Sequence, residues 1–334
     1  MPNHFSTTIS RRHWLLQAAS LAAASSLARP VFAAEKQPAQ IAITLDLEMS
    51  RNFPEWETMH WDYEKGNLND ETKRYAVEAA RRVKAAGGVL HFFAVGRVFE
   101  QPDISWLKEI VETGHPVGNH TYDHINVTAK TAEELQFRFQ RAPWLLRGQA
   151  IPDAIRENIQ LTTQAMKSRL GVAPNGFRTP GGFADGLKNH PEVRAILKDL
   201  GYDWVSSLYP PHLTTKPMEE PSDEVLQDIL AKTKAAQPFV YPDGMVEIPM
   251  SPISDIGAFR TGRWKLEWFL KSIRQCMEWT IDNGAVFDFL AHPSCLYVVD
   301  PEFKAIDLIC QMVREAGERA AIVDLGTIAK RVKT

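Results

Sequence analysis

Two histidines in the first half of the chain have the spacing of a metal-binding pair. His120 and His124 lie four residues apart, so their imidazoles share one face if the backbone turns helically between them. Such pairs bind zinc in hydrolases, where three protein ligands leave a fourth position for water. The pair therefore calls for a third ligand elsewhere, often a carboxylate. Two surface histidines in an ordinary loop would show the same spacing.

Two carboxylates follow the first apolar segment and could supply that ligand. The run 41–48 is short, apolar and partly β-branched, which predicts a buried strand. Asp46 and Glu48 end this strand two residues apart, so their side chains point the same way. Burying two carboxylates is costly unless they are paired or bind a metal, whereas acids at a solvated strand end need neither.

The composition is that of a globular protein. Of 334 residues, 44% are hydrophobic and 24% are charged, which suits one large domain or two small ones. The formal net charge of -3 leaves no broad basic field, so nucleic acid is not an expected partner. Cys276, Cys295 and Cys310 are too few and too widely spaced for a disulfide framework or a cysteine-type zinc site. The sequence is also compatible with one disulfide and one free thiol.

The first 34 residues have the features of an export signal. Arg11 and Arg12 precede an apolar stretch, 15–28, that is too short and too weakly apolar for a good membrane span. Small residues near Ala33 and Ala34 predict cleavage there. The pattern is similar to twin-arginine signals. We therefore expect the twin-arginine export machinery as a partner, a periplasmic or extracellular location, and no stable membrane span after cleavage.

Strand-like and helix-like segments alternate after a polar linker at 35–40. Alternation of this kind over 41–330 indicates one domain with a parallel sheet and helices outside it. The polar, proline-rich stretch 210–243 is expected to be an excursion from this pattern, with one helix at 224–235. The other expected helices are 71–86, 105–113, 131–146, 152–170, 190–200, 264–283 and 303–316.

Polar clusters stand at four of the expected strand ends. They are Asp46 with Glu48, His120 with His124, Arg178, and His292. The carboxyl ends of parallel strands are where such sheets assemble their sites. The loop at 49–67 is rich in aromatics, among them Trp61, which could stack on a sugar ring or form a hydrophobic plug.

Several motifs, in this order, resemble those of the polysaccharide deacetylases. The family's His-Ser/Thr-x-x-His metal motif is matched by His120–His124, and its Phe-Phe-x-x-Gly strand by Phe92–Gly96. Its Arg-x-Pro motif is matched by Arg178–Pro180, and its Leu-x-x-His motif by Leu290–His292 with one residue fewer. The resemblance covers roughly 41–324. It implies an α/β fold, an irregular seven-stranded (β/α) barrel.

The departures from the family pattern point to one of its branches. One residue separates Asp46 from Glu48, where the family usually has adjacent aspartates. Gly181 replaces the aromatic residue that often follows the Arg-x-Pro motif, and the family's Asp-x-x-Asp-Trp stretch is not evident. The stretch 201–207 is similar to one in the branch that includes enzymes opening cyclic amides such as allantoin.

The resemblance also implies a metal site. Glu48, His120 and His124 would hold Zn²⁺ or another divalent metal, which would polarise an acetamide carbonyl and acidify water. Asp46 would take the proton from that water. The roles of Asp46 and Glu48 could be exchanged without losing the site.

The remaining roles follow from residue chemistry together with the resemblance. Arg178 would pair with Asp46 and keep it ionised, and His292 would protonate the departing amine. Gly181 would offer its backbone N–H to the oxyanion, and Trp61 would contact the substrate.

Three functions are compatible with these patterns. The leading hypothesis is a metal-dependent hydrolase that removes N-acetyl groups from an acetylated amino-sugar oligo- or polysaccharide that is exported or lies in the cell wall. The Asp-x-Glu spacing also fits an amidohydrolase that opens a small cyclic amide or imide. The aromatic loop and the missing aspartate motif would fit a carbohydrate-binding barrel without activity.

The export signal makes a direct prediction. Changing both Arg11 and Arg12 to Lys is expected to leave the precursor in the cytoplasm, because the twin-arginine pair is what the machinery reads. Cell fractionation of tagged wild-type and mutant chains measures this. Normal arrival of the double mutant outside the cytoplasm would show that another route is used.

Overall fold

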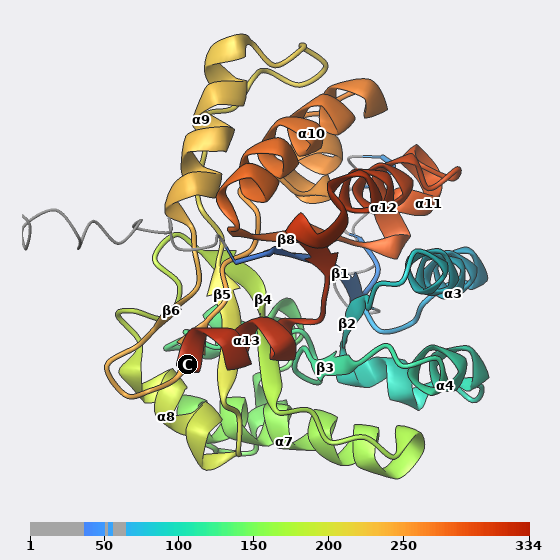
Figure 1. The fold of residues 1–334 in the computed structure, drawn as a ribbon. Helices are drawn as coiled ribbons and strands as arrows, with labels where there is room; N and C mark the ends of the chain where they lie inside the picture. Colours follow the sequence, from blue (N-terminus) through green and yellow to red (C-terminus); the bar gives the residue numbers. More distant parts are fainter. Residues whose placement is uncertain (1–36, 51–52, 56–64) are drawn as a thin grey trace, which may run out of the picture. The chain divides into compact units, whose positions relative to one another are not determined.

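The computed structural model describes residues 37–50, 53–55 and 65–334, and a curled, mostly parallel sheet lies at its centre (Figure 1). The strands follow the order β6-β7-β5-β4-β3-β2-β1-β8, with β9 beside β1. Their bounds are β1 Ala39–Leu47, β2 His91–Ala94, β3 Val117–Asn119, β4 Gly176–Phe183, β5 Trp204–Leu208, β6 Phe239–Val240, β7 Val246–Glu247, β8 Val286–Ala291 and β9 Ala320–Ile322. From β7 to β8 the order contains seven parallel strands, while β6 pairs antiparallel with β7. The expected α/β fold with an irregular seven-stranded barrel is confirmed.

Strand β1 organises the sheet because it has three neighbours. It pairs with β8 along one edge, and its other edge is shared by β9 and β2. Strand β1 begins at Ala39, inside the expected linker, because β9 pairs with its first three residues. The two ends of the strand order approach each other, since the Ser251 N–H donates to the Asp288 carbonyl on β8 at 2.9 Å. The sheet is therefore an almost closed barrel.

Helices surround the sheet (Figure 1). Their bounds are α3 Asp70–Ala85, α4 Ser105–Glu112, α5 Ala132–Leu135, α6 Phe137–Arg141, α7 Ile151–Leu170, α8 Pro191–Asp199, α9 Asp223–Ala235, α10 Leu266–Asn283, α11 Pro293–Val299, α12 Lys304–Ala316 and α13 Leu325–Lys333. Short 3₁₀ segments lie at Gly96–Glu100, Pro143–Leu146 and Gly317–Arg319, and a π-helix lies at Ile256–Thr261. Helix α3 begins where the Asn69 side chain accepts a hydrogen bond from the Thr72 N–H and so caps the amino end of the helix.

The last helix closes one end of the barrel. Leu325 and Ile328 of α13 are fully buried and pack in one cluster with Ala42, Phe93 and Trp204 from the barrel interior. The Leu325 N–H also reaches the ring of His91, the first residue of β2. Helix α13 thus covers the amino ends of the strands, and the carboxyl ends are left for a site.

Some expected elements differ from the structure. The single helix expected at 131–146 is instead α5, α6 and a 3₁₀ turn, because Gln136 is fully extended and Pro143 cannot continue a helix. The sequence reasoning missed α11, α13 and the π-helix. The excursion at 210–243 contains α9, as expected, and its end contributes β6 to the sheet.

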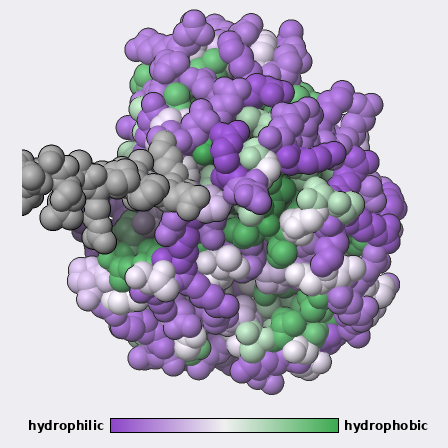
Figure 2. All heavy atoms as spheres, viewed as in Figure 1, coloured by the Kyte–Doolittle hydropathy of each residue, from purple (hydrophilic) through white to green (hydrophobic). Residues whose placement is uncertain are grey.

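Several expectations concern residues that the structure does not describe. The export signal at 1–34 and Trp61 lie outside the described residues. Among the described helices, none is both long and apolar enough to cross a membrane. The three cysteines are all buried free thiols. Polar side chains cover most of the face in Figure 2, with apolar residues in separate groups.

A fully buried arginine links the strands inside the barrel. The Arg178 guanidinium on β4 donates to Asp288 at 2.5 Å, to Asp46 at 3.2 Å and to the hydroxyls of Thr44 and Ser206 at 2.7 and 3.1 Å. Thr44 in turn donates to Asp288 at 2.7 Å. These contacts join β1, β4, β5 and β8. A buried guanidinium is tolerated only when its donors are satisfied in this way.

The Arg178–Asp288 pair therefore carries more stability than a surface pair. Asp288→Asn is expected to lower the free energy of unfolding by roughly 3–5 kcal/mol, because it removes one carboxylate from a buried ion pair. The matched control is Asp307→Asn, since Asp307 pairs with Arg82 at 2.7 Å on the surface. That change is expected to cost about 1 kcal/mol or less. Urea unfolding measures both, and equal losses would contradict the central place given to Asp288.

Candidate metal and catalytic site

The two predicted metal-binding histidines come together without a helix. His120 follows β3, and the segment to His124 is a tight loop in which Thr121 and His124 have φ values of 58° and 55°. The expected helical turn is therefore absent, yet the two rings lie 5.1 Å apart between centroids. Asn119 accepts a hydrogen bond from the Thr121 N–H, and Thr121 accepts one from the Ile125 N–H. Left-handed backbone at non-glycine residues is costly and tends to occur at functional sites.

Asp123 holds this loop against its neighbours. Its carboxylate accepts from Arg97 and Arg138, each at 2.6 Å, and from the Asn158 amide at 2.9 Å. The Asn158 side-chain oxygen accepts from the N–H groups of Tyr122 and Asp123. Asp123 thus fixes the loop through these groups and makes no hydrogen bond to either histidine.

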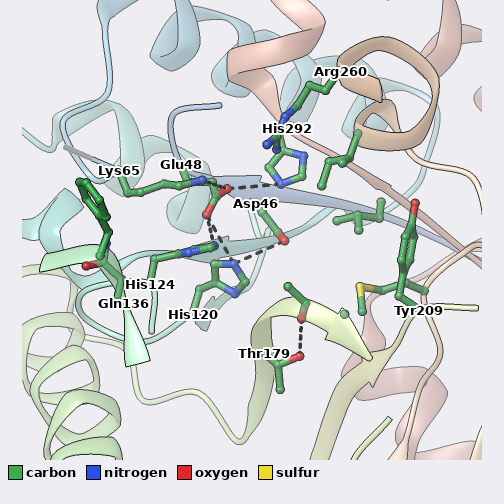
Figure 3. Close-up of a pocket in the computed structure, with 16 residues that line it drawn as sticks. Asp46, Glu48, Lys65, His120, His124, Gln136, Thr179, Tyr209, Arg260 and His292 are labelled. Carbon is green, nitrogen blue, oxygen red and sulfur yellow. Dashed lines mark hydrogen bonds and ion pairs between the residues drawn. The ribbon is translucent and has the colours of Figure 1, made fainter. Parts of the chain in front are cut away.

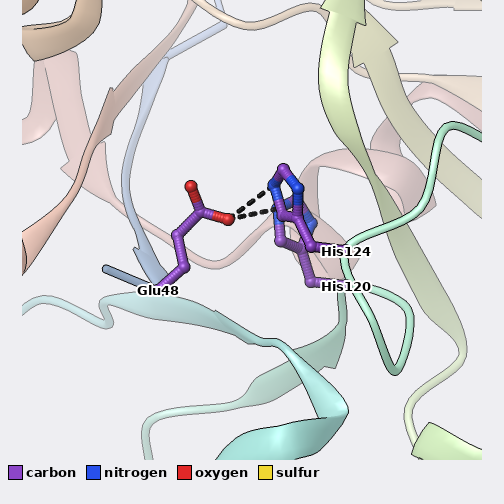
Figure 4. Close-up of side chains that lie close together, drawn as sticks. All are labelled: Glu48, His120 and His124. Atoms are coloured by element: carbon purple, nitrogen blue, oxygen red, sulfur yellow. Dashed lines mark ion pairs between the residues drawn. The ribbon is translucent and has the colours of Figure 1, made fainter. Parts of the chain in front are cut away.

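Glu48 completes a group of three possible metal ligands. One ligand atom each from Glu48, His120 and His124 lies within 4.8 Å of the others (Figure 4). Glu48 Oε2 is buried and lies 2.5 Å from His124 Nε2 and 3.7 Å from His120 Nε2. A buried carboxylate oxygen that faces two imidazole nitrogens suits a divalent cation such as zinc.

The tautomer of His120 favours metal binding. Its Nδ1 lies 2.9 Å from the carbonyl oxygen of Arg178, so Nδ1 carries the proton and Nε2 presents a lone pair toward Glu48. Burial, opposed mainly by Asp46, lowers the pKa of His120 to about 4. The imidazole is therefore neutral near neutral pH, as a metal ligand must be.

Lys65 occupies the other oxygen of Glu48. Its ammonium lies 2.7 Å from Glu48 Oε1, and the residue is almost fully buried. Burial alone would raise the pKa of Glu48, but His124 and Lys65 outweigh it and hold the pKa well below its usual range. Glu48 is therefore ionised and offers Oε2 alone to a metal. The sequence reasoning missed Lys65, which lies within the loop at 49–67 and belongs to no motif.

Asp46 lies beside this cluster but is held separately. Its Oδ1 accepts from Arg178 at 3.2 Å, and its Oδ2 lies 3.7 Å from His120 Nε2. Asp46 lies within β1, and Glu48 lies just beyond its end. Both side chains line the same pocket. The expected pairing of Arg178 with Asp46 is present, and Asp288 shares the guanidinium. Burial raises the pKa of Asp288 to about 6, against the opposing effect of Arg178.

His292, which directly follows β8, faces the cluster and has a carboxylate behind it. Asp255 Oδ1 lies 2.9 Å from His292 Nδ1, and its Oδ2 accepts from the His292 N–H. His292 Nε2 then points toward Glu48 Oε1, at 3.7 Å. Burial alone would lower the pKa of His292, but Asp255 and the hydrogen bond to it raise it overall. Asp255 was missed because the carboxylate follows an irregular segment rather than a predicted strand.

These side chains surround one pocket of about 460 Å³ (Figure 3). The pocket brings together six of the predicted site residues, namely Asp46, Glu48, His120, His124, Gly181 and His292. Arg178 lies behind the wall and supports Asp46. Gly181 has a φ of 71°, within an irregular part of β4. Met250, Ile256 and Leu290 form the apolar wall, and the volume suits a small ligand or part of a larger one.

Known protein structures share this fold. A Mycobacterium smegmatis protein described as a polysaccharide deacetylase is 16% identical, with 90% of this chain and 92% of that chain covered and a TM-score of 0.58. PuuE allantoinase is 14% identical, with coverages of 89% and 91% and a TM-score of 0.55. A Pseudomonas aeruginosa PAO1 protein described as a polysaccharide deacetylase is 12% identical, with coverages of 87% and 89% and a TM-score of 0.54. At these identities the likeness shows a common fold. No curated protein sequence matches the chain.

A family model matches part of the chain. Residues 67–205 match the model described as polysaccharide deacetylase. This segment includes His120, His124 and Arg178, while Glu48 and His292 reach the same pocket from outside it. The segment 67–205 is therefore similar to the polysaccharide deacetylases, which indicates a hydrolase that acts on amide bonds.

Proposed function

We propose that the protein is a metal-dependent hydrolase that removes N-acetyl groups from an acetylated amino-sugar oligo- or polysaccharide. The observation that carries this proposal is the clustering of the ligand atoms of Glu48, His120 and His124. Asp46 lies near His120, and His292 lies near Glu48. An amide hydrolase needs a base for water and an acid for the departing amine, and this arrangement offers both.

Glu48, His120 and His124 would hold the metal. The donor set of two imidazoles and one carboxylate is the one that catalytic zinc sites use, with a position left open. A bound Zn²⁺ would supply Lewis acidity, polarising the amide carbonyl and lowering the pKa of water. Lys65 helps to keep Glu48 ionised, and the Arg178 carbonyl fixes the tautomer of His120.

Asp46 is the proposed general base. Its Oδ1 is bound by Arg178, so Oδ2 remains to take a proton from the attacking water. Arg178 therefore acts as a positioning residue that fixes the orientation of the carboxylate. Transfer of this proton by a well-placed base is worth typically ~10²–10⁴ in rate.

His292 is the proposed acid. When the carbon–nitrogen bond breaks, the departing amine needs a proton, and His292 Nε2 faces the pocket from which it leaves. Asp255 holds the opposite ring nitrogen and stabilises the protonated imidazole. The Gly181 N–H is the proposed donor to the oxyanion, and Met250 with Leu290 offers an apolar surface to the acetyl methyl group.

A second function keeps some support. The pocket volume of about 460 Å³ also fits a small cyclic amide or imide, and the Asp46-x-Glu48 spacing is compatible with such a substrate. The same groups would then open a ring and release no second product. Acetate release separates the two reactions. Export by the twin-arginine route, with action in the periplasm or outside the cell, remains part of the proposal for an exported or cell-wall substrate.

The roles of the two carboxylates can be tested separately. Asp46→Asn keeps the size of the side chain but removes its basicity, so kcat for acetate release from an acetylated oligosaccharide should fall by roughly 10² or more. Zinc should still bind. Glu48→Gln should weaken zinc binding, because a neutral amide is a poorer ligand than a carboxylate. Zinc titration and acetate release, both run on each variant, give the answer.

Two other outcomes would change this assignment. Loss of zinc by Asp46→Asn, together with its retention by Glu48→Gln, would exchange the two roles. Full activity in both variants would show that neither carboxylate takes part in the reaction, and this would contradict the proposal. Asp307→Asn is the control, since this surface carboxylate lies outside the pocket.

A further inference from the structure

An arginine in the pocket lining has no partner for its charge among the residues that the structure describes. Arg260 lines the same pocket as His292, and both are labelled in Figure 3. Among the described residues it makes no hydrogen bond or ion pair, and its Nε is buried without an acceptor. We propose that Arg260 binds a carboxylate on the substrate, so that the enzyme prefers amides that carry an acidic group. This inference rests on the proposed function for the identity of the reaction.

The other cations near the pocket are already engaged. Lys65 is bound to Glu48, and Arg178 to Asp46 and Asp288. Arg263, three residues after Arg260, donates to the Pro54 carbonyl at 2.7 Å and lies over the Phe53 ring. Within the part of the chain that the structure describes, Arg260 is thus the pocket cation that is available to a ligand.

Partial burial makes it unfavourable for the Arg260 guanidinium to remain without acceptors. A half-buried guanidinium loses part of its hydration, and this loss is offset only when its donors find acceptors. Arg260 finds none in the described protein. Arginine presents a planar fork of N–H groups that matches a carboxylate with two parallel hydrogen bonds. An acidic ligand would therefore satisfy donors that the fold leaves open.

The local backbone holds this arginine at the pocket wall. Arg260 belongs to the π-helix Ile256–Thr261, in which the wider turn departs from regular helical spacing. Such π segments occur frequently at functional sites. Ile256 of the same turn also lines the pocket, and Asp255 just before it holds His292. One short segment thus carries both the partner of the proposed acid and the proposed carboxylate-binding group.

The link to His292 through Asp255, which directly precedes the π-helix that carries Arg260, indicates which part of the substrate is acidic. His292 is the proposed proton donor to the departing amine, so the amine portion of the amide lies on the His292 side of the pocket. A carboxylate bound by Arg260 would then belong to this amine portion and not to the acyl group. An N-acetylated amino sugar with an acidic substituent and a small N-acetyl amino acid both have this chemistry.

A binding experiment with matched acid and ester ligands tests the inference. The probes are N-acetylmuramic acid and its methyl ester, and N-acetylglycine and its methyl ester, titrated calorimetrically into the full-length protein. The wild type is expected to bind the acid of at least one pair tighter than the ester by about tenfold, the size of one charge-assisted hydrogen bond. Arg260→Gln should abolish this preference and leave ester binding unchanged. Arg263→Gln is the matched control and should keep the preference.

The results also separate this inference from the proposed function. Preference within the sugar pair alone would identify a sugar acid, and preference within the glycine pair would identify a small acid. Equal binding of acid and ester by the wild type, or an unchanged preference in Arg260→Gln, would overturn the carboxylate site. Acetate release from a neutral acetylated oligosaccharide is measured separately. If no acetate is released, the proposed function fails, whereas the binding result still decides whether Arg260 binds a carboxylate.

Discussion

The buried guanidinium of Arg178 is the constraint on which the site depends. It lies inside the barrel at 0% exposure, bound to Asp46 and Asp288, while its own carbonyl accepts from the ring of His120. One residue of β4 therefore orients the proposed base through its side chain and a proposed metal ligand through its backbone. Since the cost of burying this charge is met by acceptors from several strands, the barrel and the site stabilise each other.

The charges of the pocket follow a simple spatial order. Each proposed reacting group has a fixed partner on the side away from the pocket: Arg178 for Asp46 and Asp255 for His292. Lys65 binds one oxygen of Glu48, and the other faces the two histidines. Partners of this kind select one tautomer or one orientation, so the polar groups are positioned before a substrate arrives. Arg260 differs, because its charge lacks such a partner among the described residues.

Periodicity and motifs predicted the sheet, most helices and six residues of the pocket. This worked because buried strands and polar strand ends leave local signals, as at Asp46 and His292. What could not be predicted arises from contacts between distant segments. Lys65 and Asp255 lie in irregular segments, so no hydrophobic periodicity marks their positions. Asp288 lies within an apolar strand, and its partner Arg178 on β4 is brought to it only when the barrel folds. The histidine pair converges through a left-handed loop that its spacing does not indicate.

The central claim is that Glu48, His120 and His124 hold one metal ion in this pocket. X-ray absorption at the zinc edge, on protein loaded with one equivalent of zinc, tests it most directly. The account predicts nitrogen and oxygen neighbours at roughly 2.0–2.2 Å with the scattering signature of two imidazoles, and of one imidazole in His120→Ala. A spectrum without imidazole scattering, or one unchanged by His120→Ala, would contradict it.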